Sequence, residues 1–490
     1  MNIPFEGTIC ERNEKMLKYF LPGLAVITLG AAETFFPVED PQPGNWFVNS
    51  VRHSRPTAER FYREKLDKLD PRPVRAQWAE LYHRMIEQRF VSNRLEEEAI
   101  EKALGWPKGD FTWHNHKFYT RTGCTSWIIA PDASSTGACI VQKNRDYTGQ
   151  NLLSVRLFRA APGRYKVLTV TDLWNTGAGA AMNEKGVMIV QNDASNKDSM
   201  YRSVTTGCIF ILRYIAENCA TKDEAVSCLK EFYRSGIARS GSIYLIADLN
   251  SGVIVEATAR RVASADLDFA FEARANNLLL PGMRNSVINK RENFLKGANR
   301  RFAASEFLRK TLQEKGRIAP PDLMRLARLR DPEDEKAGYR QVCMKYTLAS
   351  TMMVPDRMFP DFLSAAFVAL GPTRHTVFVP IPMGVSKMPE SLVDGEWGTA
   401  ALELAKKLPL DHNRLPEFEA LEKKFIGEFF AAREAARKLL LNRKKNDAVK
   451  LLDELFARQY EEARAFIAKV TAETPAPKPE AAKPKESKAK

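Results

Sequence analysis

A cysteine at the start of a predicted β-hairpin constrains this sequence more than any other feature. Cys124 lies in the run Thr-Gly-Cys-Thr-Ser at 122–126, and the run Lys-Asn-Arg-Asp-Tyr follows at 143–147. Between them, the apolar segments 127–130 and 138–142 flank a stretch that contains Pro and Gly. Apolar runs separated by turn-forming residues predict a strand, a turn and a second strand. The hairpin brings the polar residues of its second strand back beside Cys124, which indicates a candidate nucleophile site.

The thiol of Cys124 needs a base to act as a nucleophile at neutral pH, because a free cysteine has a pKa of about 8.5. If the chain is cut before Cys124, the new α-amino group titrates at about 7.7–8.0, close enough to serve first as base and then as acid. Gly123 has no side chain, so the peptide can bend for the thiol to attack its carbonyl group. The alternative is a buried, inert cysteine.

Three further stretches follow Cys124 in a fixed order. The first is Lys-Asn-Arg-Asp at 143–146. The second is Met-Asn-Glu-Lys-Gly-Val at 182–187, with Val-Gln-Asn at 190–192. The third is Arg-Ala-Asn-Asn-Leu at 274–278. Asn and Asp are also common turn residues, so the alternative for the first two stretches is an ordinary turn.

Together with Gly123 and Cys124, this series resembles the N-terminal-nucleophile hydrolases. The resemblance is to the acyl-CoA:isopenicillin N acyltransferase and carcinine hydrolase family, with the choloylglycine (bile-salt) hydrolases as relatives, and it spans residues 123–382 but neither end of the chain. It implies an α+β protein with the four-layer αββα fold, extended by N- and C-terminal helices. It also implies a self-processing linear-amide hydrolase or acyltransferase, with no cofactor and a small-molecule amide as substrate.

The resemblance assigns roles to individual residues. Asp146 would orient the new amine or the thiol, Asn192 would supply part of the oxyanion hole, and Asn276 would be a second amide near the scissile carbonyl. An uncharged amide donor of this kind is typically worth about 3 kcal/mol to the transition state. Lys143 and Asn144 would bind substrate or support the site, although Lys143 stands where bile-salt hydrolases have arginine, which disfavours that specificity.

The predicted elements come in blocks of strands and blocks of helices, which favours a layered α+β fold over a doubly wound parallel sheet. Residues 107–123 are predicted to be a loop with one strand. The predicted divisions are a signal-like segment, a helical propeptide or small subunit, the hydrolase domain, a helical extension and a disordered basic tail, at residues 1–32, 33–123, 124–388, 389–470 and 471–490.

Composition narrows the partners and the compartment. The net charge is +14, but the sequence has no zinc-finger spacing and no basic stripe interleaved with aromatic residues, so we expect no nucleic-acid partner. The seven cysteines are irregularly spaced and imply no disulfide framework. Residues 16–32 have a basic start, an apolar stretch and a small-residue exit, which favours export to the periplasm or outside the cell. A buried N-terminal helix in a cytoplasmic protein is the alternative, and a homo-oligomer remains open.

Other site chemistries have weaker support in the sequence. His114 and His116 would share one face of a strand, but no third metal ligand is evident, so we expect no metal site. A papain-like pair of Cys124 and His375 would need no chain cleavage, yet no flanking signature supports it. A dipeptidase on the same fold stays open. The alternative outside enzymes is a helical interaction protein built on residues 55–106 and 390–470.

Overall fold

The computed structural model describes residues 35–38, 72–86, 90–117, 123–147, 153–159, 162–173, 175–198, 206–288, 291–330 and 341–475. The chain divides into two units, residues 1–33 and 34–490, and every described residue belongs to the second unit. The signal-like segment and residues 476–490 of the predicted basic tail therefore lie outside the described residues, whereas the helix Lys445–Glu473 continues past residue 471, where the tail was predicted to begin.

The first sheet has seven antiparallel strands in the order β10-β9-β8-β7-β6-β5-β4. Most neighbours in this sheet are also neighbours in sequence, because short turns such as that at 248–251 join them into hairpins. The strands are β4 Leu153–Arg159, β5 Lys166–Asp172, β6 Ala180–Asn183, β7 Met188–Asp193, β8 Ser242–Ala247, β9 Gly252–Ala257 and β10 Val262–Asp266.

The second sheet has six antiparallel strands in the order β11-β2-β3-β12-β13-β14. The predicted hairpin forms its centre, with β2 and β3 paired along their whole length. The strands are β2 Gly123–Ile129, β3 Ile140–Asp146, β11 Phe271–Arg274, β12 Thr347–Val354, β13 Ala365–Leu370 and β14 Val379–Pro382. A separate two-stranded ladder pairs β1 Phe35–Pro37 with β15 Lys387–Pro389.

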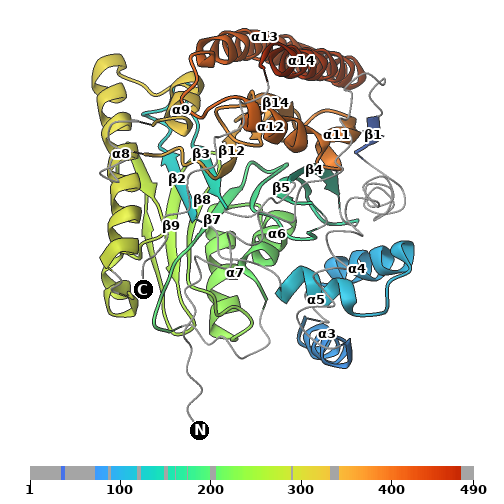
Figure 1. Ribbon diagram of the computed structural model, residues 1–490, viewed down its shortest axis with the longest axis vertical. Coiled ribbons are helices and arrows are strands. Elements are labelled where there is room, and N and C mark those ends of the chain that lie inside the picture. The colour runs from blue at the N-terminus through green and yellow to red at the C-terminus, as the bar shows by residue number, and fades with distance from the viewer. Residues whose placement is uncertain are drawn as a thin grey trace, which may run out of the picture. The chain divides into compact units, whose positions relative to one another are not determined.

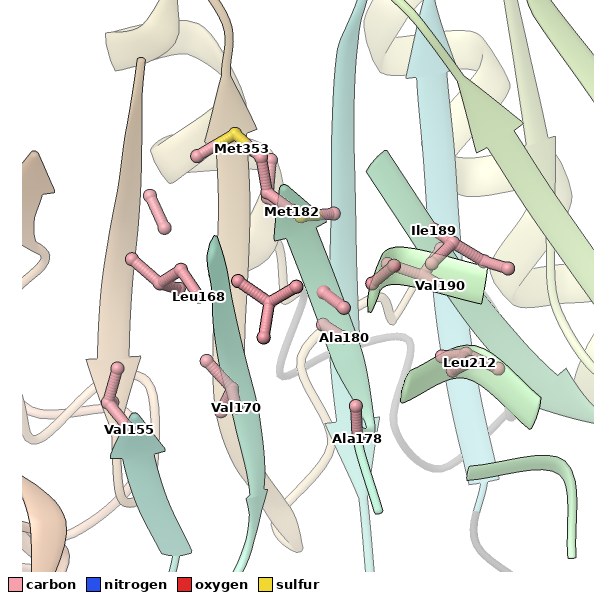
Figure 2. Packing of buried hydrophobic residues seen from close by; sticks show 14 of the residues in the cluster. Val155, Leu168, Val170, Ala178, Ala180, Met182, Ile189, Val190, Leu212 and Met353 are labelled. Atoms are coloured by element: carbon pink, nitrogen blue, oxygen red, sulfur yellow. The ribbon is translucent and has the colours of Figure 1, made fainter. Parts of the chain in front are cut away.

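The two sheets pack face to face, with β2 and β3 against β7 and β8. Successive side chains of a strand point to opposite faces, and the six-stranded sheet divides its apolar residues accordingly. Ile128 joins the core between the sheets, whereas Trp127 and Ile129 join a second core beneath helices. Figure 2 shows part of the first core, where Met353 of β12 belongs to the same cluster as Met182 of β6.

Helices cover the outer faces of both sheets and complete four layers (Figure 1). Helices α6 and α7 pack on the seven-stranded sheet, and α8, α9, α12, α13 and α14 contact the six-stranded one. The helices are α3 Arg72–Ile86, α4 Val91–Leu104, α5 Asp110–Lys117, α6 Cys208–Asn218, α7 Lys222–Arg234, α8 Arg291–Lys315, α9 Pro320–Ala327, α10 Pro360–Leu363, α11 Glu390–Val393, α12 Glu396–Lys407, α13 Leu415–Leu441 and α14 Lys445–Glu473, with a 3₁₀ turn at Pro281–Ser286. Within the described residues, none of these helices combines the length and the apolar character needed to cross a bilayer.

The structure confirms the α+β class and the predicted hairpin, but it corrects the stretch 107–123. Residues 110–117 form helix α5 instead of a loop and a strand. The carboxylate of Glu101 accepts hydrogen bonds from the backbone N–H groups of Gly109, Phe111 and Thr112, at 2.8–3.4 Å. A helix start capped from eight or more residues upstream has no local sequence signal, because the usual capping residue precedes the helix directly.

The helices after Pro389 share the main core of the molecule, to which they contribute Leu404, Phe425 and Leu452. A buried ion pair also joins them to the region of the sheets. Arg328, directly after α9, donates to both carboxylate oxygens of Glu422 in α13, at 2.6 Å each. In Figure 1, α13 and α14 lie side by side as a long helical pair, in agreement with their mutual contacts.

Candidate active site

The pairing of β2 with β3 sets the geometry around Cys124. Gly123 lies opposite Asp146, and Cys124 lies opposite Arg145. Cys124 shares its face of the strand with Ser126, which hydrogen-bonds across to the seven-stranded sheet. Asp146 points the other way, toward α8. Asp146 therefore lies beside Gly123, on the face of the hairpin opposite the side chain of Cys124.

Gly123 is tightly enclosed at this point. A Cβ atom on Gly123 would lie 3.3 Å from Cβ of Asp146 and 3.3 Å from Nη1 of Arg300. These distances are shorter than most real Cβ contacts, so any larger residue would push the carboxyl group and the guanidinium group aside. The peptide bond between Gly123 and Cys124 therefore lies directly against a buried ion pair.

Asp146 is fully buried and is held from two sides. Thr347 of β12 donates to Oδ1 at 2.6 Å, and Arg300 of α8 donates to Oδ2 at 2.8 Å. Burial raises the pKa of the Asp146 carboxyl group above its usual value, although the charges of Arg300 and Lys143 and the hydrogen bond from Thr347 oppose this effect. The carboxyl group consequently has a fixed orientation and a proton affinity higher than that of a solvent-exposed aspartate.

Arg300 is a site residue that the sequence did not reveal. Its second donor, Nη2, reaches Oδ1 of Asn276 at 2.6 Å, so one guanidinium group links Asp146 to Asn276. The planar fork of arginine suits this arrangement, because it can donate to two acceptors at once. Sequence offers no local signal for the link, since Arg300 lies within a helix that contains several other basic residues.

Asn276 contacts the amide of Cys124 directly. The N–H of Cys124 donates to Oδ1 of Asn276 at 3.3 Å, and Nδ2 of Asn276 donates to the carbonyl oxygen of Asp193 at 2.7 Å. The neighbouring Asn277 instead lies against α8, where a Cβ on Gly297 would overlap its side chain. The model thus places Asn276, and not Asn277, beside the cysteine.

Asn192 of β7 lies next to this contact with its amide fully engaged. Its Oδ1 accepts a hydrogen bond from Oγ of Ser126 at 2.7 Å. Its Nδ2 donates to the carbonyl oxygens of Arg274 and Ala275, at 3.2 and 3.1 Å. In this uncut chain Asn192 therefore fixes the backbone that leads into Asn276, and its role as an oxyanion donor stays a prediction.

Lys143 and Asn144 point to opposite sides of β3. The buried ammonium group of Lys143 faces the other sheet and donates to the carbonyl oxygens of Gly179, at 3.2 Å, and Gln191. Asn144 faces the helices and donates to the carbonyl oxygen of Ala327, at 2.8 Å. Lys143 thus lies on the face of the hairpin that carries Cys124, whereas Asn144 anchors α9.

The alternative chemistries fall on other parts of the fold. His375 hydrogen-bonds to the carbonyl oxygen of Leu408, at 2.9 Å, and its ring faces His412. His114 and His116 lie on helix α5 and not on a strand, and Nε2 of His116 bonds to Glu97 at 2.7 Å. No group of three His, Cys, Asp or Glu side chains suited to a metal ion occurs among the residues that the structure describes.

Residues 134–351 match the family model described as acyl-coenzyme A:6-aminopenicillanic acid acyl-transferase. The matched range includes Asp146, Asn192 and Asn276, and it begins ten residues after Cys124. The resemblance to this acyltransferase family, stated from the motifs, is thereby confirmed. The match supports an enzyme of the acyl-transfer class, and a search of curated proteins found no match.

Solved structures of other enzymes also match the chain at low identity. They include an N-acylethanolamine-hydrolyzing acid amidase ortholog from Caenorhabditis elegans, with 19% identity over 47% of this chain and 92% of its own, at a TM-score of 0.34. A conjugated bile acid hydrolase variant from Clostridium perfringens has 12% identity, 53% and 92% coverage and a TM-score of 0.35. For penicillin V acylase from Agrobacterium tumefaciens the values are 14%, 53%, 86% and 0.34. At these TM-scores the likeness adds nothing to the argument, which rests on the motifs, the family match and the site geometry.

Proposed function

We propose that the chain is a self-processing cysteine amidohydrolase that cleaves linear carbon–nitrogen amide bonds of small molecules. The observation that carries this proposal is the contact between the backbone N–H of Cys124 and Asn276, beside the buried pair of Asp146 and Arg300. A purely structural cysteine would not need an amide oxygen on its peptide nitrogen together with a buried carboxyl group and a guanidinium group against the preceding glycine.

The first step is cleavage before Cys124. The thiol sulfur attacks the carbonyl carbon of Gly123, the carbon–nitrogen bond breaks, and the thiol proton passes to the departing nitrogen. The product is a thioester between Gly123 and the Cys124 side chain, together with a free α-amino group. Water then hydrolyses the thioester, which leaves a carboxylate at Gly123 and restores the thiol. Asn276 already accepts a hydrogen bond from the nitrogen that becomes this amine, and Asp146 lies against the neighbouring Gly123, so these two side chains are the proposed groups that orient the amine.

The mature site then repeats this chemistry on a substrate. The thiol of Cys124 attacks the amide carbon, the α-amino group takes the thiol proton and passes it to the leaving amine, and an acyl-cysteine forms. Water resolves this thioester in a hydrolase. Asn192 and Asn276 are the proposed amide donors near the developing oxyanion, and Lys143 supplies a positive charge on the same face of the hairpin.

Two further functions share this site. An acyltransferase would use an amine instead of water to resolve the acyl-cysteine, and the family model is that of an acyl-transferase. A dipeptidase would accept a short peptide as the amide.

We also propose export, on the basis of the signal-like segment at residues 16–32. A helical interaction protein would instead tolerate loss of the thiol without consequence.

The acyl-cysteine is the species to detect. Purified protein is mixed with a panel of N-acyl amines and dipeptides and quenched in acid, and the fragment that contains Cys124 is weighed by mass spectrometry. We expect the mass of the acyl group on this fragment, and its loss in Cys124→Ala. Cys228→Ser is the matched control, because Cys228 is a half-buried thiol on α7, outside the site. Acylation that persists in Cys124→Ala would refute the mechanism.

A further inference from the structure

Helices α4 and α5, which precede the cleavage site, form hydrogen bonds with every polar group of one residue in the sheet region. That residue is Thr176, in the loop between β5 and β6, and it is fully buried. Asn115 of α5 accepts from the N–H of Thr176 at 3.3 Å and donates to its hydroxyl oxygen at 2.6 Å. The hydroxyl group donates to Glu97 of α4 at 3.0 Å, and Asn93 donates to the carbonyl oxygen at 3.0 Å.

A buried ion pair and a ring cluster reinforce this contact. Arg213 of α6 donates to both carboxylate oxygens of Glu96 in α4, at 2.5 and 2.6 Å, and it also donates to the carbonyl oxygen of Thr176 at 2.7 Å. Phe90 packs against Tyr214 and Phe232, with ring centroids 5.2 and 5.4 Å apart. Because these groups are shielded from water, separating the two surfaces would expose charges and rings that the interface now satisfies.

The loop that contains Thr176 leads directly to the candidate active site. Gly177 and Gly179 follow Thr176, and the carbonyl oxygen of Gly179 accepts the hydrogen bond from the ammonium group of Lys143. Backbone hydrogen bonds also hold this loop on the sheet side: Ala178 donates to the carbonyl oxygen of Ile209 in α6 at 2.9 Å, and Gly179 donates to that of Val170 in β5 at 2.8 Å. The recorded hydrogen bonds from the helices 72–117 to this loop all go to Thr176, so Thr176 is the residue through which these helices can influence the position of Lys143.

We propose that helices α3–α5 order residues 175–179 through Thr176, so that they act as a positioning element for Lys143. The catalytic value of this positioning rests on the function proposed above. The ordering of the loop does not depend on cleavage and can be tested in a cut or an uncut chain.

The first measurement is hydrogen–deuterium exchange in peptides that cover 175–180. Asn115→Ala removes the acceptor of the Thr176 N–H, and we expect exchange in this loop to become about tenfold faster, as for the loss of roughly one net hydrogen bond. Thr176→Val, which removes only the hydroxyl group, is the milder variant should Asn115→Ala fold poorly, and Thr176→Ser should retain protection. Asn218→Ala is the control, since Asn218 lies on α6 and donates to the carbonyl oxygen of Tyr214. Loop exchange that matches wild type in both Asn115→Ala and Thr176→Val would overturn the positioning role.

The second measurement separates positioning from general damage. With an amide substrate in hand, Thr176→Val and Lys143→Met should each lower kcat, and the double variant should be no slower than Lys143→Met alone, because the two changes act through one contact. Losses that multiply would contradict the proposal. A large fragment of the cut wild type that stays active after losing 72–117 would overturn it. A chain that is never cut refutes self-processing but leaves the exchange result to decide the loop's role.

Discussion

Replacement of Arg300 by methionine tests whether the buried pair beside Gly123 serves the cleavage step. The guanidinium group makes two charge-assisted hydrogen bonds, to Asp146 at 2.8 Å and to Asn276 at 2.6 Å. Bonds to charged groups contribute about 1.5–3 kcal/mol each. Asp146 keeps its bond from Thr347, and its carboxyl group can take up a proton. We therefore place the stabilisation lost with the two Arg300 bonds at the lower end of this range, about 3 kcal/mol in total.

If the transition state for cleavage loses this much stabilisation, cleavage becomes about 100-fold slower. The assay follows the fraction of cut chain by intact mass after rapid expression and purification. Arg309→Met is the matched control, because Arg309 lies on the same helix and contacts only Gln313 in an exposed hydrogen bond that the structure records. Asp146→Asn combined with Arg300→Met should recover stability, since no buried carboxylate is left unpaired, while cleavage stays slow. Cleavage of Arg300→Met within threefold of wild type would refute the reasoning.

Three other substitutions have outcomes set by the structure. Lys143→Met removes the buried cation on the face of Cys124, and we expect kcat for amide cleavage to fall at least about tenfold in a steady-state assay. Burial and the neighbouring His412 lower the pKa of His375 to about 4. The contribution of His375 to the free energy of unfolding is therefore present above its unfolded pKa, near 6.5, and is lost as the pH falls toward 4. His375→Gln should make the free energy of unfolding, measured by urea titration, less sensitive to acid. Glu422→Ala leaves the buried Arg328 unpaired, and urea titration should show a loss of about 3–5 kcal/mol.

Sequence predicted those parts of the fold that have a local period or turn signal. The two apolar runs on either side of a stretch with Pro and Gly predicted the hairpin of β2 and β3. The run Leu-Asn-Ser-Gly at 249–252 is a turn signal of the same kind between β8 and β9. Thr221, with Glu224 three residues later, has the pattern of a capping box, and its hydroxyl group accepts from the N–H of Glu224, at 3.2 Å. Each of these features depends on residues close together in the chain, which is the range that periodicity and capping rules describe.

The features that sequence missed depend on residues distant in the chain. Helix α5 is capped by Glu101 of the preceding helix, and Arg300 meets Asp146 across a separation of 154 residues. Asn276 and Asn277 are adjacent, and a one-residue shift would change which of them faces the cysteine. The contacts of Arg300, Asn276 and Asn277 follow from the packing of α8 on β2 and β11, which no local pattern encodes.

Intact mass and N-terminal sequencing of the purified protein, beside Cys124→Ala, test the central claim most directly. The account predicts two fragments from the wild type, the larger of which begins at Cys124, and a single uncut chain from the variant. Gly123→Val adds a second variant, which should remain uncut because its side chain would displace Asp146 and Arg300. A wild-type chain that remains whole, or one that is cut at the same bond without the thiol, would contradict the account.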